Sequence, residues 1–261
     1  MPPTLERALI LRTFEFSENS QVVHILTLEE GLIHGIAKGA RRLNGAFHGG
    51  LDSLTLGTLG VYARRPGAGL RTLASFRVET NFPELRRSLA RFDAAEHVRA
   101  LILSFAREEQ EAPLVFELAV AALALIAAAD EVAATALALG FEAMLLQLSG
   151  FFPEVTRCVR CDREARNIHT TRISALRGGL LCRRCRGEDP GAPEIDGRTV
   201  AALVTLGAGP LVQAARLPAD PDLRRAISRA LDAWTSSILD RRLPTRAALM
   251  RANVRRPRAD G

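Results

Sequence analysis

Residues 20–42 read SQVVHILTLEEGLIHGIAKGARR, and this stretch decides the first half of the fold. Two runs of alternating apolar and polar residues flank a charged turn at residues 29–31, a pattern typical of two short strands. The positions expected to line one face are Val22, His24 and Leu26 in the first run, and Leu32, His34 and Ile36 in the second.

The same alternation continues on both sides of this stretch. It predicts a strand before it, a fourth strand near residues 54–62 and a fifth after the turn RPGAG at residues 65–69. Five short strands within residues 5–80 favour a small closed barrel, most commonly an OB-fold, with an SH3-like barrel as the rival. The first strand is expected to place Ala8, Ile10 and Phe14 on one face with Arg12 between them, and the fifth to alternate through Leu70, Thr72, Ala74, Phe76 and Val78.

The spacing of the apolar residues along the chain changes after residue 82. Apolar residues recur at helical spacing, and the alanine-rich run of residues 114–129 is apolar nearly all round, which predicts a central, buried helix. Gly150 and Pro153 interrupt the pattern, which resumes after residue 194. We therefore predict an α+β protein with an OB-fold barrel at residues 1–80 and a helical domain at 81–261 that carries a cysteine-bearing module at about 154–190. Three predicted helices each have one apolar face. These faces consist of Val98, Leu101, Ile102 and Phe105; of Phe141, Met144, Leu145 and Leu148; and of Ile227, Leu231, Trp234 and Ile238.

Composition narrows the class of protein. The 261 residues are 48% hydrophobic and 25% charged, which excludes collagen-like, low-complexity and disulfide-knot chains. Lys38 is the only lysine, so arginine supplies nearly all of the basic charge. The net charge of +6 divides into +2 for residues 1–80, −5 for 81–150, +4 for 151–193 and +5 for 194–261. Basic segments of this kind favour a polyanion partner, although coding bias also enriches arginine.

The chain carries no pattern of a membrane or secreted protein. Its longest apolar stretch, residues 118–129, is too short to span a bilayer, and the N-terminus lacks a basic segment followed by an apolar one. A cytoplasmic, nucleoid-associated protein with no membrane partner is expected. Its four cysteines should then be reduced rather than paired in disulfides.

Those four cysteines form two CxxC pairs, CVRC at residues 158–161 and CRRC at 182–185. Pairs separated by 20 residues have the spacing of a tetrahedral four-thiolate zinc site. Two thiol redox motifs are the weaker alternative, because redox CxxC motifs usually open a helix after a strand. Four ligands leave no position for a reacting water, so a single structural Zn²⁺ is predicted at Cys158, Cys161, Cys182 and Cys185; His169 is the one other candidate ligand.

Nine arginines surround the cysteines within residues 157–186. Four thiolates and one Zn²⁺ carry a net charge of −2, and nearby guanidinium groups such as those of Arg160 and Arg183 can offset it. The other arginines can equally contact phosphate. Both interpretations remain open from the sequence.

A second basic cluster follows the hairpin at Lys38, Arg41 and Arg42, where it opens a loop with four glycines. Cations on a barrel loop can hold a nucleic-acid backbone, and the alternative is a solvated basic turn. Arg64, Arg65 and Arg71 lie near the next hairpin and are expected to extend the cluster. Aromatic residues that can stack on bases are scarce, which favours contact with the backbone rather than sequence readout; the candidates are Phe47, Tyr62 and Phe76, with Phe76 expected in the core.

The C-terminal region adds seven arginines between Arg241 and Arg258, a pattern of frayed solubilising tails and also of polyanion-binding segments. Signatures of catalysis are missing: the chain has no GxxxxGK[ST], HExxH or GxSxG motif. No enzymatic activity is expected.

Several of these segments together resemble the RecO family of bacterial DNA repair proteins, over about residues 5–190. The residues that carry the resemblance are Ile10-Leu11-Arg12, Gln21-Val22-Val23, Leu26-Thr27, Gly31, Lys38-Gly39-Ala40-Arg41, Leu54 to Tyr62, Gly150-Phe151 and Gly178-Gly179-Leu180-Leu181-Cys182. The resemblance implies an OB-fold on a helical domain with a zinc module, and it places Lys38 and Arg41, with Arg42 beside them, on the DNA-facing loop. The segment after Arg42 has fewer cations than is common in that family.

The resemblance further implies a recombination mediator of the RecFOR pathway, active in the response to DNA damage. Such a protein binds single- and double-stranded DNA, anneals complementary strands and assists loading of the RecA recombinase onto strands coated by single-strand binding protein. The implied partners are RecR and the C-terminal tail of single-strand binding protein. Two other hypotheses are a non-enzymatic protein–protein scaffold in repair and an RNA-binding OB-fold regulator.

Overall fold

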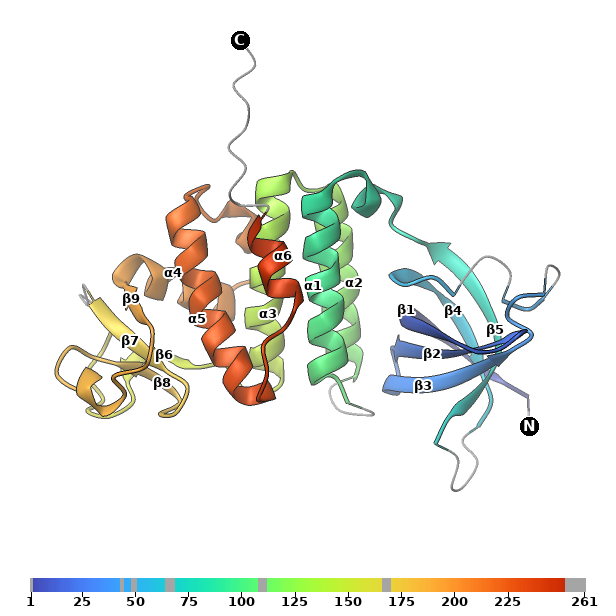
Figure 1. Cartoon of the computed structure of the whole chain (residues 1–261), viewed down its shortest axis with the longest axis horizontal. Helices are drawn as coiled ribbons and strands as arrows, with labels where there is room; N and C mark the ends of the chain where they lie inside the picture. The colour runs from blue at the N-terminus through green and yellow to red at the C-terminus, as the bar shows by residue number, and fades with distance from the viewer. Residues whose placement is uncertain are drawn as a thin grey trace, which may run out of the picture.

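The computed structural model describes residues 2–42, 45–47, 51–63, 69–107, 112–165 and 170–251. The chain begins with five strands that close into a barrel in the order β1-β2-β3-β5-β4 (Figure 1). All neighbours are antiparallel except β3 and β5, which run parallel. The prediction of a five-stranded, OB-like barrel is therefore confirmed. The strands are β1 (Thr4–Ser17), β2 (Ser20–Thr27), β3 (Gly31–Lys38), β4 (Thr55–Val61) and β5 (Arg71–Thr80).

The alternation separates two faces of each strand, and the structure shows which of them lines the interior of the barrel. In β2 and β3 the interior positions are Val23, Ile25, Ile33 and Ala37, whereas His24 and His34 lie on the outer face. These strands are apolar on both faces, so period-two alternation alone does not say which face is inside. In β1 a register shift between Ile10 and Arg12 ends the predicted series, and Phe14 is exposed.

Close packing at two glycines lets the barrel close. A Cβ at Gly57 in β4 would lie 2.2 Å from the carbonyl oxygen of Arg77, and one at Gly35 in β3 would lie 2.5 Å from the Leu73 side chain. Both neighbours belong to β5, which pairs with β3 and β4. Absence of a side chain at these positions lets the fifth strand approach both of its partners.

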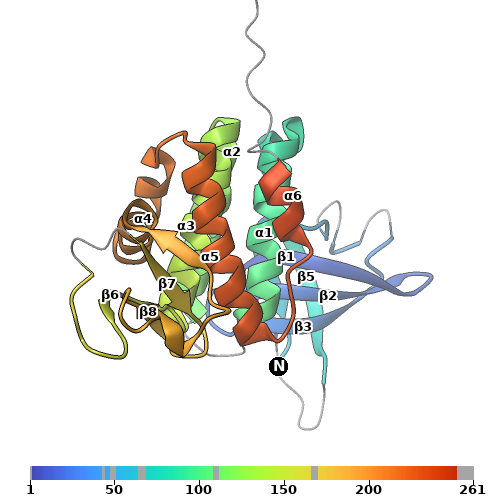
Figure 2. The ribbon, with the colours of Figure 1, turned by 60° about the vertical axis from the view of Figure 1, so that its left-hand side comes forward.

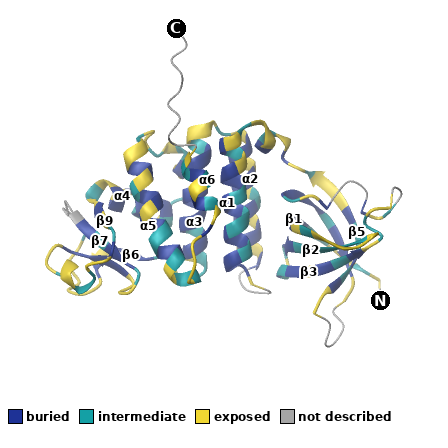
Figure 3. Ribbon diagram, viewed as in Figure 1, coloured by how far each residue is buried: buried dark blue, intermediate teal, exposed yellow. Residues whose placement is uncertain are grey.

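The helical domain is organised around α3 (Glu131–Leu148), which contacts the other long helices and is buried almost throughout its middle (Figures 1 and 3). The predicted central helix, α2 (Ala112–Ala128), instead lies beside α3 and exposes one face, consisting of Leu114, Glu117, Ala121, Ala124 and Ala128. Alanine suits an exposed helix face through its high helix propensity, so an alanine-rich run is compatible with either position. The other helices are α1 (Leu89–Phe105), α4 (Gly197–Ala208), α5 (Pro221–Leu239), α6 (Thr245–Arg251) and the short helices η1 (Pro83–Arg87) and η3 (Leu211–Arg216).

Among the residues that the structure describes, one helix, α3, is long and apolar enough to cross a membrane by length and composition. Within the structure 67% of that segment is buried among neighbouring helices. This burial is what the core helix of a helical domain requires, so α3 gives no indication of a membrane protein.

The cysteine-bearing module stands at the end of the helical domain away from the barrel (Figures 1 and 2). Its four strands pair in the order β6-β8-β7-β9, and a short helix, η2 (Arg186–Glu188), follows the second CxxC. Asp196 then caps α4 by accepting a hydrogen bond from the Thr199 N–H. The strands are β6 (Glu154–Cys158), β7 (Thr170–Ser174), β8 (Gly179–Leu181) and β9 (Glu194–Asp196).

Barrel and helices share a continuous hydrophobic core. Leu9, Leu11 and Leu26 of the barrel belong to the same buried cluster as the residues of α1, α2 and α3. Polar contacts cross the junction as well: Arg99 of α1 donates to the Leu11 carbonyl, and the Leu32 N–H donates to the Arg107 carbonyl. The barrel is thereby held in a fixed place on the helical domain.

Candidate functional site

The four cysteines meet in one cluster, as their spacing predicts. Their Sγ atoms all lie within 4.8 Å of one another, and those of Cys161 and Cys182 are 3.7 Å apart. Tetrahedral Zn–S bonds of about 2.3 Å place sulfurs about 3.8 Å apart. The donor set and its spacing therefore fit a four-thiolate metal site.

Tight turns in both CxxC segments aim the sulfurs at one point. In the first, the Asp162 N–H donates to the Cys158 carbonyl, and in the second the Cys185 N–H donates to the Cys182 carbonyl. The Cys182 N–H also donates to Cys158 Sγ at 3.4 Å, which ties the two turns together. The strands β6 and β8 bring the turns side by side, because they pair with each other.

The thiols have very unequal acidities without a cation. Burial raises the pKa of Cys158, but N–H donation from Cys182, Arg160 and Cys161 outweighs it and lowers that pKa to about 6. Burial and hydrogen bonds with the other cysteines, together with the charge on Cys158, raise the pKa of Cys185 to about 12. Four adjacent thiolates repel one another, and a divalent cation at their centre removes this penalty.

Most arginines of the module are already paired. Arg160 donates to Glu188 at 2.6 Å, Arg157 to Asp162 at 3.0 Å and Arg172 to Glu194 at 3.1 Å. Arg177 and Arg186 pair with Glu188 and Glu194 as well. Within the described part of the chain, Arg183 and Arg184 have no carboxylate within ion-pairing distance and remain exposed.

The KGARR segment forms a tight, exposed turn at the end of β3. Gly39 has φ of 72°, a left-handed conformation that glycine adopts without strain, and the Arg42 N–H donates to its carbonyl at 3.1 Å. Lys38 and Arg42 are exposed and have no carboxylate within ion-pairing distance in the described ranges. Arg41 is exposed too, but it forms an ion pair with Glu15 of β1. Two cations of this turn are thus free to meet an anion, and a third is partly neutralised.

The structure does not extend the cluster to Arg71. That side chain is buried, where it forms an ion pair with Glu30 and donates to the Tyr62 carbonyl. It closes the barrel next to the β2–β3 turn and is not available to a phosphate. Arg64 and Arg65 lie outside the described residues.

Of the three aromatic residues that the sequence offers for stacking on bases, the structure exposes one. Phe76 is in the barrel core as expected, and Phe47 is buried beside it, while Tyr62 is exposed. An aromatic group that the sequence did not reveal is instead present on the outer face of β1–β3, at Phe14, His24 and His34. The alternation placed each of these residues on a predicted strand face, but it did not show that these faces lie outside the barrel and next to one another.

A second unpredicted cluster lies inside the helical domain. Glu142 of α3 accepts hydrogen bonds from Thr235 of α5 at 2.6 Å and from Arg246 of α6, and it contacts His97 of α1 at 3.3 Å. His97 and Glu142 are completely buried, and the second ring nitrogen of His97 is 2.9 Å from the Thr245 hydroxyl. This network joins four helices, and its carboxylate and imidazole are completely buried among them, so its role is structural.

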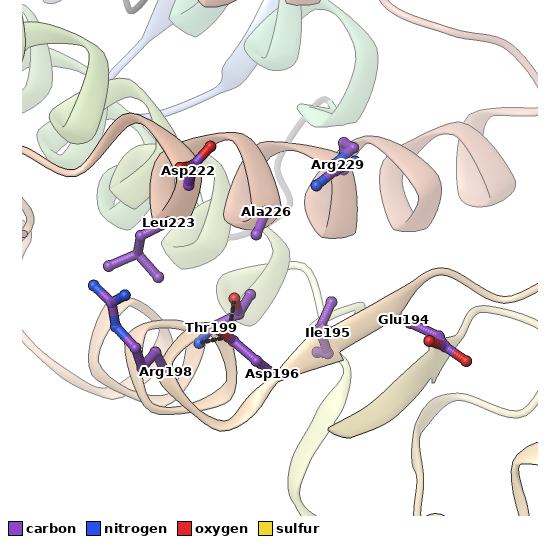
Figure 4. A pocket seen from close by; sticks show the side chains of 9 residues that line it. All are labelled: Glu194, Ile195, Asp196, Arg198, Thr199, Asp222, Leu223, Ala226 and Arg229. Atoms are coloured by element: carbon purple, nitrogen blue, oxygen red, sulfur yellow. Dashed lines mark hydrogen bonds between the residues drawn. The ribbon is translucent and has the colours of Figure 1, made fainter. Parts of the chain in front are cut away.

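A cavity of about 310 Å³ lies between β9, α4 and α5, and most of the charged side chains that line it are already paired (Figure 4). Asp196 is occupied in capping α4, Arg198 pairs with Asp220 at 2.7 Å, and Asp222 pairs with Arg225. These groups already serve the ends of α4 and α5. Arg229 is exposed and forms no ion pair with a described residue, so the cavity offers one cation rather than a set of convergent polar groups.

Comparison with known proteins agrees with these features. The family model described as Recombination protein O N terminal matches residues 1–82, and the model described as Recombination protein O C terminal matches residues 86–247. The first covers the barrel, and the second covers the helices and the cysteine module.

Individual relatives give the same result. A protein named DNA repair protein RecO from Rhodopirellula baltica is 32% identical over 216 residues, which cover 82% of this chain and 79% of the relative. One of the same name from Anaeromyxobacter sp. (strain K) is 33% identical over 241 residues, 92% of this chain and 93% of the relative. Another from Alkaliphilus metalliredigens is 28% identical over 232 residues, with coverage of 89% and 92%. With an OB-like barrel, a helical domain and a four-cysteine cluster in the matched order, the chain belongs to the RecO family of DNA repair and recombination proteins.

Proposed function

We propose that this protein is a non-enzymatic recombination mediator that binds single- and double-stranded DNA without sequence specificity and anneals complementary strands. The observation that carries the proposal is the exposed turn at the end of β3, where Lys38 and Arg42 have no carboxylate partner among the described residues. Membership of the RecO family supports the assignment to DNA repair and recombination.

The physical basis is neutralisation of charge. Complementary strands repel through their phosphates, and a basic surface that contacts only phosphates lowers this repulsion while the base edges stay free to pair. Lys38 ends β3 and Arg42 lies in the hydrogen-bonded turn that follows, so contact with a phosphate needs little rearrangement of the main chain that carries them. No covalent bond is made or broken in annealing, which agrees with the absence of a catalytic motif in the sequence.

The assignments of partners and cofactor rest on the family as well. We propose RecR and the C-terminal tail of single-strand binding protein as protein partners, assistance to RecA loading as the outcome and the cytoplasm as the location. For the cysteine cluster we propose one Zn²⁺ held by Cys158, Cys161, Cys182 and Cys185. The metal would hold the two CxxC turns together, and the exposed Arg183 and Arg184 on the second turn would be presented toward DNA.

An annealing assay tests the proposal. Two complementary labelled oligonucleotides coated with single-strand binding protein are mixed with the protein, and duplex formation is followed by fluorescence. We expect faster annealing with the natural chain and a marked loss with the double variant Lys38→Gln/Arg42→Gln. A control variant, Arg216→Gln/Arg229→Gln, removes two exposed charges from the helical domain and should behave like the natural chain.

Two outcomes would favour the other hypotheses. Selective binding of RNA over DNA of the same sequence would indicate an RNA-binding regulator. Failure to bind any nucleic acid, with retained binding to RecR, would indicate a protein–protein scaffold.

A further inference from the structure

Three side chains form a ladder of rings on the outer face of the barrel. Phe14 of β1, His24 of β2 and His34 of β3 follow one another across the sheet. The ring centroids of Phe14 and His24 are 5.1 Å apart, and those of His24 and His34 are 4.0 Å apart with planes only 25° from parallel. Arg12 extends the ladder, because its guanidinium lies 4.6 Å from the Phe14 ring centre.

The ladder borders a cleft of about 810 Å³ between the barrel and the helical domain. One wall consists of Arg12, His24, His34 and Leu32 from the barrel. The other wall is formed by the C-terminal half of α1 and by the segment that joins α5 to α6. From this second wall come Arg99, Leu103, Ser104, Arg107, Arg241, Leu243 and Thr245.

The charged groups that line the cleft are all basic. Arg99 is neutralised by Glu96, to which it donates twice. Arg107 donates only to main-chain carbonyls, and Arg241 donates to the Ser104 hydroxyl at 3.0 Å. No carboxylate lines the cleft among the described residues, which leave out 108–111. The cleft therefore has a positive charge that no described residue of its wall balances.

The cleft also has surfaces for a flat, apolar group. Leu32, Leu103 and Leu243 line it between the basic residues, and the imidazole of His34 is exposed at the end of the ladder. Burial lowers the pKa of His24, and the neighbouring His34 and Arg12 lower it further. His24 is thus a neutral ring near pH 7, which suits stacking. Rings beside guanidinium groups match the two parts of a nucleotide, the base and the phosphate.

We propose that this cleft binds at least one unpaired nucleotide of single-stranded DNA, with its base against the His24–His34 rings and its phosphates near Arg12 and Arg241. This inference rests on the proposed function, and it adds the route that a bound DNA strand would follow along the protein surface. His34 and Lys38 lie on the same face of β3, four residues or roughly 13 Å apart. A strand held by the β3 turn can therefore continue along the outer face of β1–β3, the face that OB-folds use for oligonucleotides, and enter the cleft.

A single strand fits these features better than a duplex or an acidic peptide. Bases in a duplex are stacked on one another and cannot stack on side chains without being unpaired. An acidic peptide would satisfy the arginines but would leave the ring ladder without a role. Binding by such a peptide instead of DNA is one of the outcomes that the experiment distinguishes.

The test uses the full-length protein and a single-stranded oligonucleotide that contains 2-aminopurine, whose fluorescence changes when the base stacks. We expect the natural chain to bind and to quench the probe. The ring variant Phe14→Ala/His34→Ala should bind between about 5-fold and 150-fold more weakly, the range to which ~1–3 kcal/mol of stacking per base corresponds. The charge variant Arg241→Gln, which removes a phosphate contact, should also bind more weakly. The ring variant should also lose the quenching.

Two matched controls separate this effect from general loss of charge or apolar surface. Phe92→Ala removes a ring of similar exposure, 41% against 37% for Phe14, on the N-terminal half of α1. Arg242→Gln removes the charge next to Arg241 from a side chain that does not line the cleft. Both controls should bind and quench as the natural chain does.

Three other outcomes would contradict the proposed cleft, the proposed function or both. If the ring variant binds and quenches like the natural chain while Lys38→Gln/Arg42→Gln does not, the cleft assignment is wrong and the proposed function stands. If the natural chain does not bind the oligonucleotide, both are wrong. If an Asp- and Glu-rich peptide binds, loses affinity in Arg241→Gln and does not compete with the oligonucleotide, the cleft is a peptide site.

Discussion

At the scale of single residues, the most consequential side chain of the helical domain is a buried carboxylate. Burial raises the pKa of Glu142, but the charge of Arg246 and the hydrogen bond with His97 outweigh it and lower the pKa to about 2. Burial and the charge of Arg246 lower the pKa of His97, which is therefore neutral and donates a hydrogen bond to Glu142. Folding thus depends on a charged glutamate and an uncharged histidine side by side.

Both pKa shifts predict loss of stability in acid. A carboxylate with a pKa below its ordinary 4.5 contributes stability that is present above pH 4.5 and is lost as pH falls toward 2. A histidine with a lowered pKa adds to the loss, because the unfolded chain takes up a proton below about pH 6.5 and the folded chain does not. Denaturant unfolding measured by circular dichroism should show the free energy of unfolding falling from pH 6.5 downward, by about 3 kcal/mol for Glu142 alone by pH 2.

Substitution at this position gives the matching experiment. Glu142→Gln leaves the Arg246 guanidinium buried without its closest counter-charge, and we expect a loss of about 3 kcal/mol at pH 7. Glu117→Gln, at an exposed ion pair with Arg7, should cost less than about 1 kcal/mol. Equal effects of the two substitutions would contradict the importance assigned to the buried network.

The sequence did not reveal this cluster, because its members lie on four separate helices.

At the scale of strands and helices, closure of the barrel depends on the glycine of β4. Gly57→Ala would bring a methyl group to 2.2 Å from the Arg77 carbonyl oxygen and 2.7 Å from the Phe76 ring. Because both neighbours are held in the sheet, we expect a loss of stability of about 2 kcal/mol or more, measured by thermal melting. Gly69→Ala, where an added Cβ meets nothing within 4 Å, is the control and should melt near the natural chain.

The cysteine module gives a second prediction at this scale. Its strands are only three to five residues long, so much of its order should come from the metal rather than from a core of its own. Cys161→Ser, or treatment with a strong chelator, should remove one zinc per chain by elemental analysis. It should also raise hydrogen exchange within residues 154–196, while the barrel stays protected. Absence of metal from the purified natural chain, with no effect of chelator, would contradict the site.

The elements themselves could be predicted from the sequence to different degrees. The two CxxC spacings and the strand alternation indicated the metal cluster and the five-stranded barrel. The alternation did not show which face of β2 and β3 lies inside the barrel, because both faces carry apolar residues. The predicted place of α2 was wrong, since alanine occurs both in buried and in exposed helix faces.

At the scale of the whole molecule, the charge is divided among three modules that the structure holds in a row (Figure 1). The acidic helical segment of residues 81–150 lies between a basic barrel and a basic cysteine module. The charge sums pointed to a polyanion, but they did not show which cations are free. Arg71 was assigned to the basic cluster from its position near a hairpin and is instead buried with Glu30, whereas Lys38 and Arg42 are exposed without a described partner. Pairing depends on tertiary contacts and cannot be read from local sequence.

The salt dependence of DNA binding tests the central claim most directly. The affinity for a single-stranded oligonucleotide is measured from low to moderate salt for the natural chain and for Lys38→Gln/Arg42→Gln. Each phosphate contact on a single strand contributes about 0.7 to the slope of log affinity against log salt. We predict weaker binding by the variant and a slope smaller by about 1.4. An unchanged affinity and slope would contradict the assignment of the β3 turn to DNA.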